Sequence, residues 1–274
     1  MAAKKSKDLA KIKESDKAMG VVKDYRQEMA EYAKDDGARE PAAAGNNISI
    51  RGGEFTLGGE VVGDPMRVIV LDYVFENAFY DMKYDKDNPS PPACFAVSRN
   101  EKDMAPDESS PKPQAANCAE CENNQFGTAD VGKGKACKNQ RRLALINADV
   151  KSVDEEYAAS AEVAFIRLPP SSLKLWKGYV RKLTEGLQLP LFSVVTELSI
   201  DPDSEYPVII PSLGNELPED RDLIGSLVER RNEIASELLI GYDVSNYEEP
   251  TDRKSKKKAV AIPAKKTEKK RSKF

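Results

Sequence analysis

The sequence predicts a mainly β protein with flanking helices, and three observations support this fold class. Short runs rich in β-branched residues recur through the middle of the chain. Glycine and proline punctuate these runs, and two amphipathic helical patterns accompany them. The strongest run, MRVIVLDYVF at residues 66–75, is almost continuously apolar and therefore predicts a buried strand.

The other elements follow from local patterns. The glycine-rich stretch 48–63 reads as a hairpin. Two prolines stop a strand before the first helix, at 171–185, and Pro218 suits the first turn of a second helix at 218–240. Further strands are predicted at 142–148, 162–168, 191–200 and 206–210. Several strands, a helix and two more strands match an OB-like Greek-key barrel, in which a helix joins the third and fourth strands.

The chain divides into four regions by composition. Residues 1–36 carry apolar side chains at helical spacing and predict an N-terminal helix, and residues 37–47 read as a linker. The OB-like β domain is expected at 48–241, with a proline-rich loop inserted at about 81–140. Residues 242–274 read as a disordered basic tail.

Charge is distributed unevenly along the 274 residues. The formal net charge is −4, but the 22 residues from 253 onward contain eleven Lys or Arg and one acid. Residues 1–36 sum to +1, which leaves −15 for the part between. A basic tail can bind nucleic acid by releasing counterions, or it can simply be solvated. An acidic body restricts any specific nucleic-acid site to a local basic strip.

Composition also excludes several classes of protein. The chain has no histidine, so it has no Ser-His-Asp or Cys-His triad and no histidine-ligated metal. We expect no transmembrane helix and no secretory signal, and hence a cytoplasmic protein. We also expect that the protein is not an enzyme. A metal-dependent nuclease is the enzymatic alternative, with Asp85 and Asp87 or Asp201 and Asp203 holding Mg²⁺.

All four cysteines fall in the proline-rich loop: Cys94, Cys118, Cys121 and Cys137. Cys118 and Cys121 form a CxxC knuckle, and the other two would complete a tetrahedral set of thiolates. Four protein ligands leave no open position for water, so we predict a structural Zn²⁺ site. Zinc could order a loop that lacks a hydrophobic core. The alternatives are an iron–sulfur cluster, a redox pair, disulfides or free thiols.

Basic and aromatic side chains near these cysteines form a candidate nucleic-acid interface. One group surrounds the last cysteine, and the other lies on the 171–185 helix. Alternative roles are a solubilising loop, a wet helix face and aromatic core packing. Further candidate stacking platforms are Tyr73, Phe75, Phe79, Tyr80 and Tyr84. The candidate residues are Phe126, Lys133, Lys135, Lys138, Arg141, Arg142, Lys174, Lys177, Tyr179 and Arg181.

The cysteine segments PPAC (91–94), CAECENNQFG (118–127) and GKGKACKN (132–139), with the strand VVT (194–196), resemble bacteriophage replication-region proteins. Those proteins are similar in plan to zinc-containing phage single-stranded-DNA-binding proteins. The resemblance covers about residues 66–210. It implies an OB-type fold that coats single-stranded DNA during replication or recombination, with replication or recombination proteins as further partners. The basic tail and the absence of a histidine ligand differ from that pattern.

We therefore expect a non-enzymatic protein that binds single-stranded DNA and carries a structural four-cysteine zinc site. The alternative is a zinc-stabilised scaffold that binds other proteins without contacting DNA. The oligomeric state and any base preference are left open by the sequence.

Overall fold

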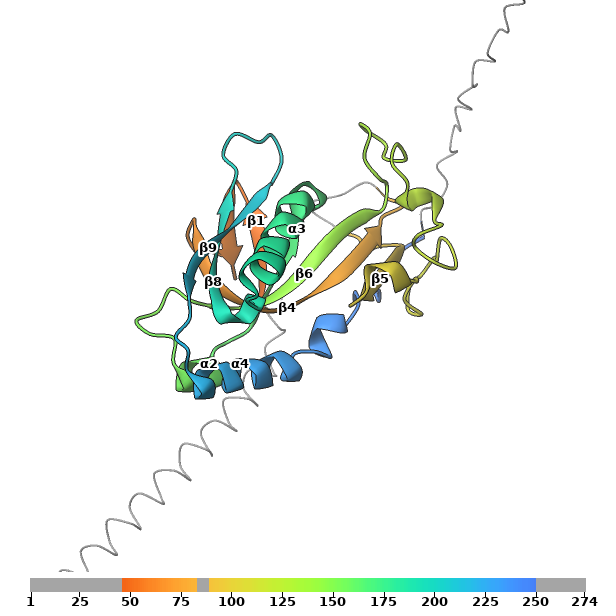
Figure 1. The fold of residues 1–274 in the computed structure, drawn as a ribbon. Coiled ribbons are helices and arrows are strands. Elements are labelled where there is room, and N and C mark those ends of the chain that lie inside the picture. The colour runs from red at the N-terminus through yellow and green to blue at the C-terminus, as the bar shows by residue number, and fades with distance from the viewer. Residues whose placement is uncertain (1–45, 83–88, 250–274) are drawn as a thin grey trace, which may run out of the picture.

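A computed structural model describes residues 46–82 and 89–249. The predicted N-terminal helix (1–36), nearly all of the linker, and the basic tail from residue 250 onward lie outside this part of the chain. The described residues form a mainly β structure built around one curled sheet (Figure 1). Its strands are β1 (Asn47–Arg51), β2 (Glu54–Leu57), β3 (Glu60–Val61), β4 (Met66–Phe79), β5 (Cys94–Ser98), β6 (Lys138–Asn147), β7 (Ala164–Leu168), β8 (Val194–Ile200) and β9 (Ile209–Glu216).

The strand order is β3-β2-β1-β7-β6-β4-β8-β9, with β5 paired to β4 outside this path. The sheet is mixed, because β1 runs parallel to β7 whereas the other pairs are antiparallel. It curls into a half-barrel whose two edges, β3 and β9, are not paired to each other. The mainly β class predicted from the sequence is confirmed.

The long strand β4 organises the sheet. Its beginning pairs with β8, its end pairs with β5, and β6 accompanies it over most of its length. A bulge between Val70 and Asp72 shifts the register, so that the side chains of Tyr73 and Phe75 share a face with those of Val68 and Val70. The sequence predicted this strand at 66–75; it continues to Phe79 because β5 supplies a second partner there.

Helices cover both faces of the sheet (Figure 1). Helix α3 (Leu173–Arg181) buries Trp176 and Tyr179 against one face, which we call the α3 face. Helices α2 (Glu155–Ser160) and α4 (Arg221–Glu233) pack on the other, the α4 face, where Leu223 and Leu227 enter a second core. Successive side chains along a strand point to opposite faces of the sheet, so alternate residues belong to the two different cores. None of the helices among the described residues combines the length and apolarity needed to cross a membrane.

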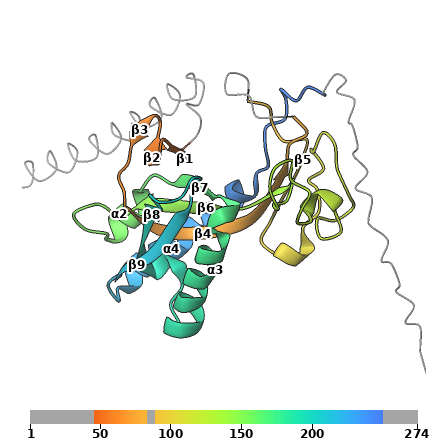
Figure 2. The ribbon, with the colours of Figure 1, turned by 90° about the horizontal axis from the view of Figure 1, so that it is seen from above.

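Beyond β8, β4 and β6 stay paired over residues 73–79 and 138–143, a stretch that we call the ribbon. The ribbon carries β5 and the irregular cysteine segment, which we define as residues 94–137, at the end away from β1–β3 (Figure 2). The segment contains two short 3₁₀ helices, Glu101–Asp103 and Glu122–Asn124. Its own apolar core is small: Ala96, Met104 and Cys118, with Phe75 of the ribbon against them.

The chain after α4 crosses the α4 face of the ribbon as a strap, residues 238–247. The hydroxyl of Tyr242 bonds to Glu76, and that of Tyr247 donates to Asp81 Oδ2 at 2.8 Å. Tyr242 also packs edge-on against Phe95, with ring centroids 5.3 Å apart. Disorder was predicted from residue 242 onward, and the structure corrects this for residues 242–249, because these aromatic side chains tether the segment.

Candidate metal centre and nucleic-acid interface

The four cysteines come together at the end of the ribbon. Cys94 opens β5 opposite Phe79 of β4, and Cys137 directly precedes β6. Cys118 and Cys121 lie in the loop between. All four side chains are buried, none forms a disulfide, and all four line one cavity of about 10 Å³. A cavity of this size has room for about one water molecule, and therefore for a single ion.

Backbone and amide hydrogen bonds fix the loop around this cavity. Cys118 N–H donates to Met104 O at 2.9 Å, and Cys137 N–H donates to Asn123 O at 2.8 Å. The amide of Asn124 donates to Cys118 O at 2.7 Å. These bonds position the CxxC knuckle near Cys137, the residue before β6, so polar contacts hold a segment that has little apolar core.

The environment of the thiols is apolar enough to disfavour thiolates. Burial raises the pKa of the Cys94 and Cys118 thiols. Burial and then the nearby Cys118, Cys121 and Cys94 raise the pKa of Cys137 to about 12. N–H donors act in the opposite direction: the Gln114 backbone at Cys94 and the Asn77 amide at Cys118. The sulfurs lie close enough together that thiolates at these positions would repel one another.

The sulfurs are nevertheless not arranged as a metal centre. Within residues 46–82 and 89–249, no group of three or more His, Cys, Asp or Glu side chains could hold a metal ion. The structure thus brings the four predicted ligands to one cavity without forming the predicted zinc loop as such. Four thiols, with backbone and amide N–H donors beside two of them, are chemically suited to Zn²⁺.

A row of aromatic rings runs from α3 onto the ribbon along the α3 face. Ring centroids are 5.9 Å apart for Tyr179 and Trp176, 5.6 Å for Trp176 and Tyr73, and 6.0 Å for Tyr73 and Phe75. The first two rings are buried, whereas Tyr73 and Phe75 are half-buried. The accessible end of the row is therefore on the ribbon, next to the cysteine segment.

Arg141 covers that end. Its guanidinium carbon lies 3.9 Å from the centroid of the Phe75 ring, and Nη2 donates to Glu101 Oε1 at 2.9 Å. Nη1 donates to the backbone oxygen of Gln140 at 2.9 Å. Phe75, Arg141 and Glu101 come from β4, β6 and the cysteine segment, so three elements meet at this point.

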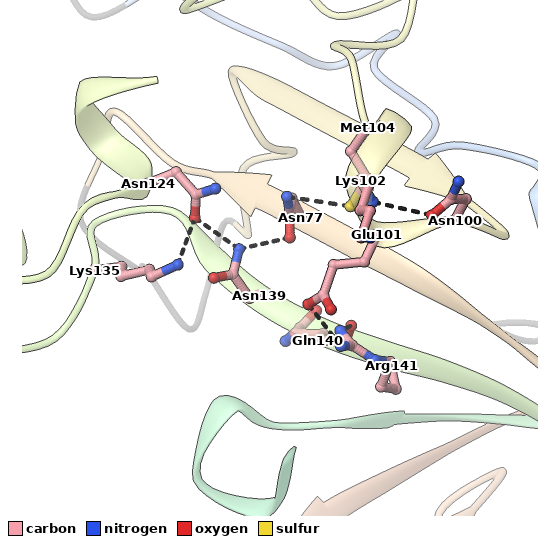
Figure 3. A network of polar contacts seen from close by, with 10 residues as sticks. All are labelled: Asn77, Asn100, Glu101, Lys102, Met104, Asn124, Lys135, Asn139, Gln140 and Arg141. Atoms are coloured by element: carbon pink, nitrogen blue, oxygen red, sulfur yellow. Dashed lines mark hydrogen bonds and ion pairs between the residues drawn. The ribbon is translucent and has the colours of Figure 1, made fainter. Parts of the chain in front are cut away.

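An amide network continues from there toward the cysteine segment (Figure 3). Asn139 donates to Asn77 Oδ1 at 2.6 Å and to Asn124 Oδ1 at 2.9 Å, and Lys135 Nζ donates to the same Asn124 oxygen at 3.2 Å. Lys135 also lies 5.2 Å from the centroid of Phe126, whose side chain is 82% exposed. Basic, amide and aromatic groups thus extend continuously along one face.

Strand alternation divides the basic strip that the sequence placed around the last cysteine. Arg141 lies on the α3 face, whereas Arg142 points to the α4 face. Arg142 is only 5% exposed and pairs with Glu76, so it is removed from the candidate nucleic-acid residues. Lys133 and Lys138 are exposed, but Lys138 follows the alternation of Arg142.

The structure likewise divides the candidates on α3. Lys174 and Lys177 are exposed, and Arg181 is exposed but bonds to Glu185 with N···O distances of 2.9–3.1 Å. Tyr179 is buried, and its hydroxyl lies 2.7 Å from Thr196 Oγ1. It cannot stack a base, because its ring belongs to the core.

Among the described residues, the nuclease alternative finds no metal-holding group of side chains. Asp85 lies with Asp87 outside the described residues. Asp201 accepts a hydrogen bond from Asp203 N–H at 3.0 Å, which is the ordinary role of Asp in a turn.

Three groups at the interface were missed by sequence reasoning: Glu101, Asn139 and Asn124. The signal for Asn139 was available, because it alternates with Arg141 in β6 and must share its face. Glu101 lies 40 residues from Arg141, so no local pattern reveals their contact.

No family model matches the chain, and no curated protein or solved structure matches it.

Proposed function

We propose that the protein is a non-enzymatic single-stranded-DNA-binding protein acting in DNA replication or recombination, as in bacteriophages, with a structural four-cysteine zinc site. The observation that carries the proposal is the α3-face row: half-buried Tyr73 and Phe75, covered by Arg141 and continued by Lys135 and the exposed Phe126. Proteins that bind single strands combine a basic path for phosphates with aromatic side chains on which bases stack.

The topology supports the same reading. The strands β4, β6, β7, β8 and β9 occur in the order of an OB-type barrel, with α3 joining the third and fourth. In that numbering the cysteine segment lies between the first two strands, and residues 201–208 join the last two. These two connections are those that OB-fold proteins use to bind oligonucleotides.

The position of the C-terminal strap supports the α3 face, rather than the α4 face, as the binding face. On the α4 face, Arg142 bonds to Leu238 O, and Arg167 lies over the Tyr242 ring with its guanidinium carbon 5.1 Å from the centroid. The protein's own chain therefore occupies that face of β6 and β7. The strap does not cover the α3 face of the ribbon, where Phe75 is half-buried.

Zinc would serve this function indirectly. Cys94, Cys118, Cys121 and Cys137 would hold it as four thiolates and, with no ligand position left for water, it would be structural. The cysteine segment has little apolar core of its own, so a metal would fix the positions of Lys135 and Glu101 relative to the ribbon.

A salt-titrated binding assay on zinc-loaded protein tests the proposal, with single-stranded and double-stranded oligonucleotides of equal length. We expect preference for the single strand and a steep loss of affinity with salt. The same assay on a chain that ends at residue 252 separates the contribution of the basic tail to DNA binding from that of the ribbon. Equal affinity for both DNA forms, lost entirely with the tail, would reject the proposal and favour the scaffold alternative.

A substitution pair locates the site. Phe75→Leu keeps an apolar side chain but removes the stacking face, so we expect weaker binding to the single strand. Phe165→Leu is the matched control, because Phe165 is a half-buried aromatic packed on the α4 face. Equal losses in both variants would mean that Phe75 has no special role.

A further inference from the structure

Arg141 is held in a position that a nucleobase would take. Its planar guanidinium lies 3.9 Å from the centroid of Phe75 and covers the ring. Arginine stacks on aromatic faces through the same flat geometry that a base uses. Phe75 is therefore already occupied in the free protein, by a group from the protein itself.

The group that holds Arg141 there is Glu101. The carboxylate accepts from Arg141 Nη2 at 2.9 Å, while the arginine side chain is 12% exposed and the glutamate side chain is 64% exposed. Asn100 caps the 3₁₀ helix that carries Glu101 by accepting from Lys102 N–H at 3.1 Å. The carboxylate is thus positioned by local structure yet remains open to solvent.

An ion pair with an exposed member contributes little to folding, so it can be exchanged for another anion. Phosphate offers Arg141 the same bidentate recognition as a carboxylate. No other acidic side chain bonds to Arg141 among the described residues. The alternative partner for the guanidinium is therefore a phosphate arriving at the same face.

We propose that Glu101 is an internal competitor that sets the affinity of this site: when single-stranded DNA binds, Arg141 exchanges Glu101 for a phosphate and uncovers Phe75 for a base. The inference rests on the proposed function. Glu101 thereby controls whether Arg141 can bind a phosphate, and Phe75 is the ring on which a base stacks once Arg141 has moved.

The test is a double-mutant cycle on the full zinc-loaded chain, read as dissociation constants for a fluorescent oligothymidine. Glu101→Gln should tighten binding by about two- to fivefold, the range for losing an exposed ion pair. Arg141→Gln should weaken binding. In the Arg141→Gln background, Glu101→Gln should have no further effect, because its target is gone.

Glu120→Gln is the charge-matched control, since Glu120 is exposed in the same segment and contacts Asn117 only through its backbone N–H. A gain from Glu101→Gln that persists without Arg141, or that Glu120→Gln reproduces, would overturn the inference and indicate general repulsion of phosphates. Wild-type protein that binds DNA while Glu101→Gln changes nothing would overturn it as well. Absence of binding by every variant would instead reject the proposed function.

Discussion

Glu76 and Arg142 form an ion pair in the interior, at the junction of the half-barrel and the ribbon. Arg142 Nε donates to Glu76 Oε2 at 2.6 Å, and Glu76 is fully buried. Arg167 Nε donates to the other carboxylate oxygen at 2.8 Å, and the Tyr242 hydroxyl bonds to it too. One carboxylate therefore joins β4, β6, β7 and the strap.

The first prediction concerns this carboxylate. Glu76→Gln should lower the free energy of unfolding by about 3–5 kcal/mol, because two arginines lose their shared charge in the interior. Urea denaturation followed by circular dichroism measures it. Glu185→Gln is the control: its pair with Arg181 is fully exposed, and we expect no measurable change. A Glu76→Gln variant as stable as the wild type would show that the buried pair does not hold the strap.

The second prediction tests the close approach of the strap to β5. A Cβ added at Gly241 would lie 2.9 Å from Phe95 Cζ and closer still to a neighbouring ring atom. Gly241→Ala should therefore destabilise the protein by about 1–3 kcal/mol through overpacking. Gly178→Ala on α3 meets no neighbouring atom and should stabilise by up to about 1 kcal/mol through helix propensity. If the melting temperatures of the two variants shifted in the same direction, the close packing of Gly241 against Phe95 would be contradicted.

Much of the fold could be predicted because its signals are local. The apolar run of β4 is readable from neighbouring residues. The second helix was predicted to start at Pro218, whereas α4 starts at Arg221, and its N-cap Asp220 accepts from Asp222 N–H at 2.8 Å. The strap was missed because its anchors are isolated: Tyr242 sits in a polar, acidic stretch, and its partner Glu76 is 166 residues away. Residue types alone do not reveal such pairs.

The candidate site was predicted in its composition but not in its geometry. The spacing of the four cysteines predicted that they share one site. It could not predict that Arg141 and Arg142 face opposite sides of the sheet, because which of two adjacent residues faces inward depends on strand register. The bulge after Val70 sets that register, and it turns Tyr73 and Phe75 to the α3 face. Tyr179 was included among the DNA-binding candidates because it lies between the apolar and the basic stripe of its helix; its hydroxyl partner Thr196 lies in β8, which no local pattern reveals.

The third prediction concerns the cysteines. Cys118→Ser and Cys121→Ser should lower bound zinc from about one ion per chain to none, measured by mass spectrometry of the native protein. Hydrogen exchange should become faster in residues 104–137 but not in β4, β7 or β8, because the two main cores exclude this segment. Ala119→Ser, at an exposed position inside the knuckle, should keep the metal. Zinc retained by both cysteine variants would contradict a four-thiolate site.

The last prediction asks whether α3 contributes to the DNA path. If Lys174 and Lys177 each contact a phosphate, replacing both by Gln should reduce the slope of log affinity against log salt by about 0.7 for each residue. The matched control replaces Arg51 and Lys151, which are also exposed. Arg51 belongs to β1, at the end away from the cysteine segment (Figure 2), and Lys151 follows the end of β6. The control should leave the slope unchanged, since both residues are remote from the ribbon.

An equal reduction in both double variants would mean that net charge, rather than a path from α3 to the ribbon, determines the salt dependence. An unchanged slope in the α3 variant would confine the site to the ribbon and the cysteine segment.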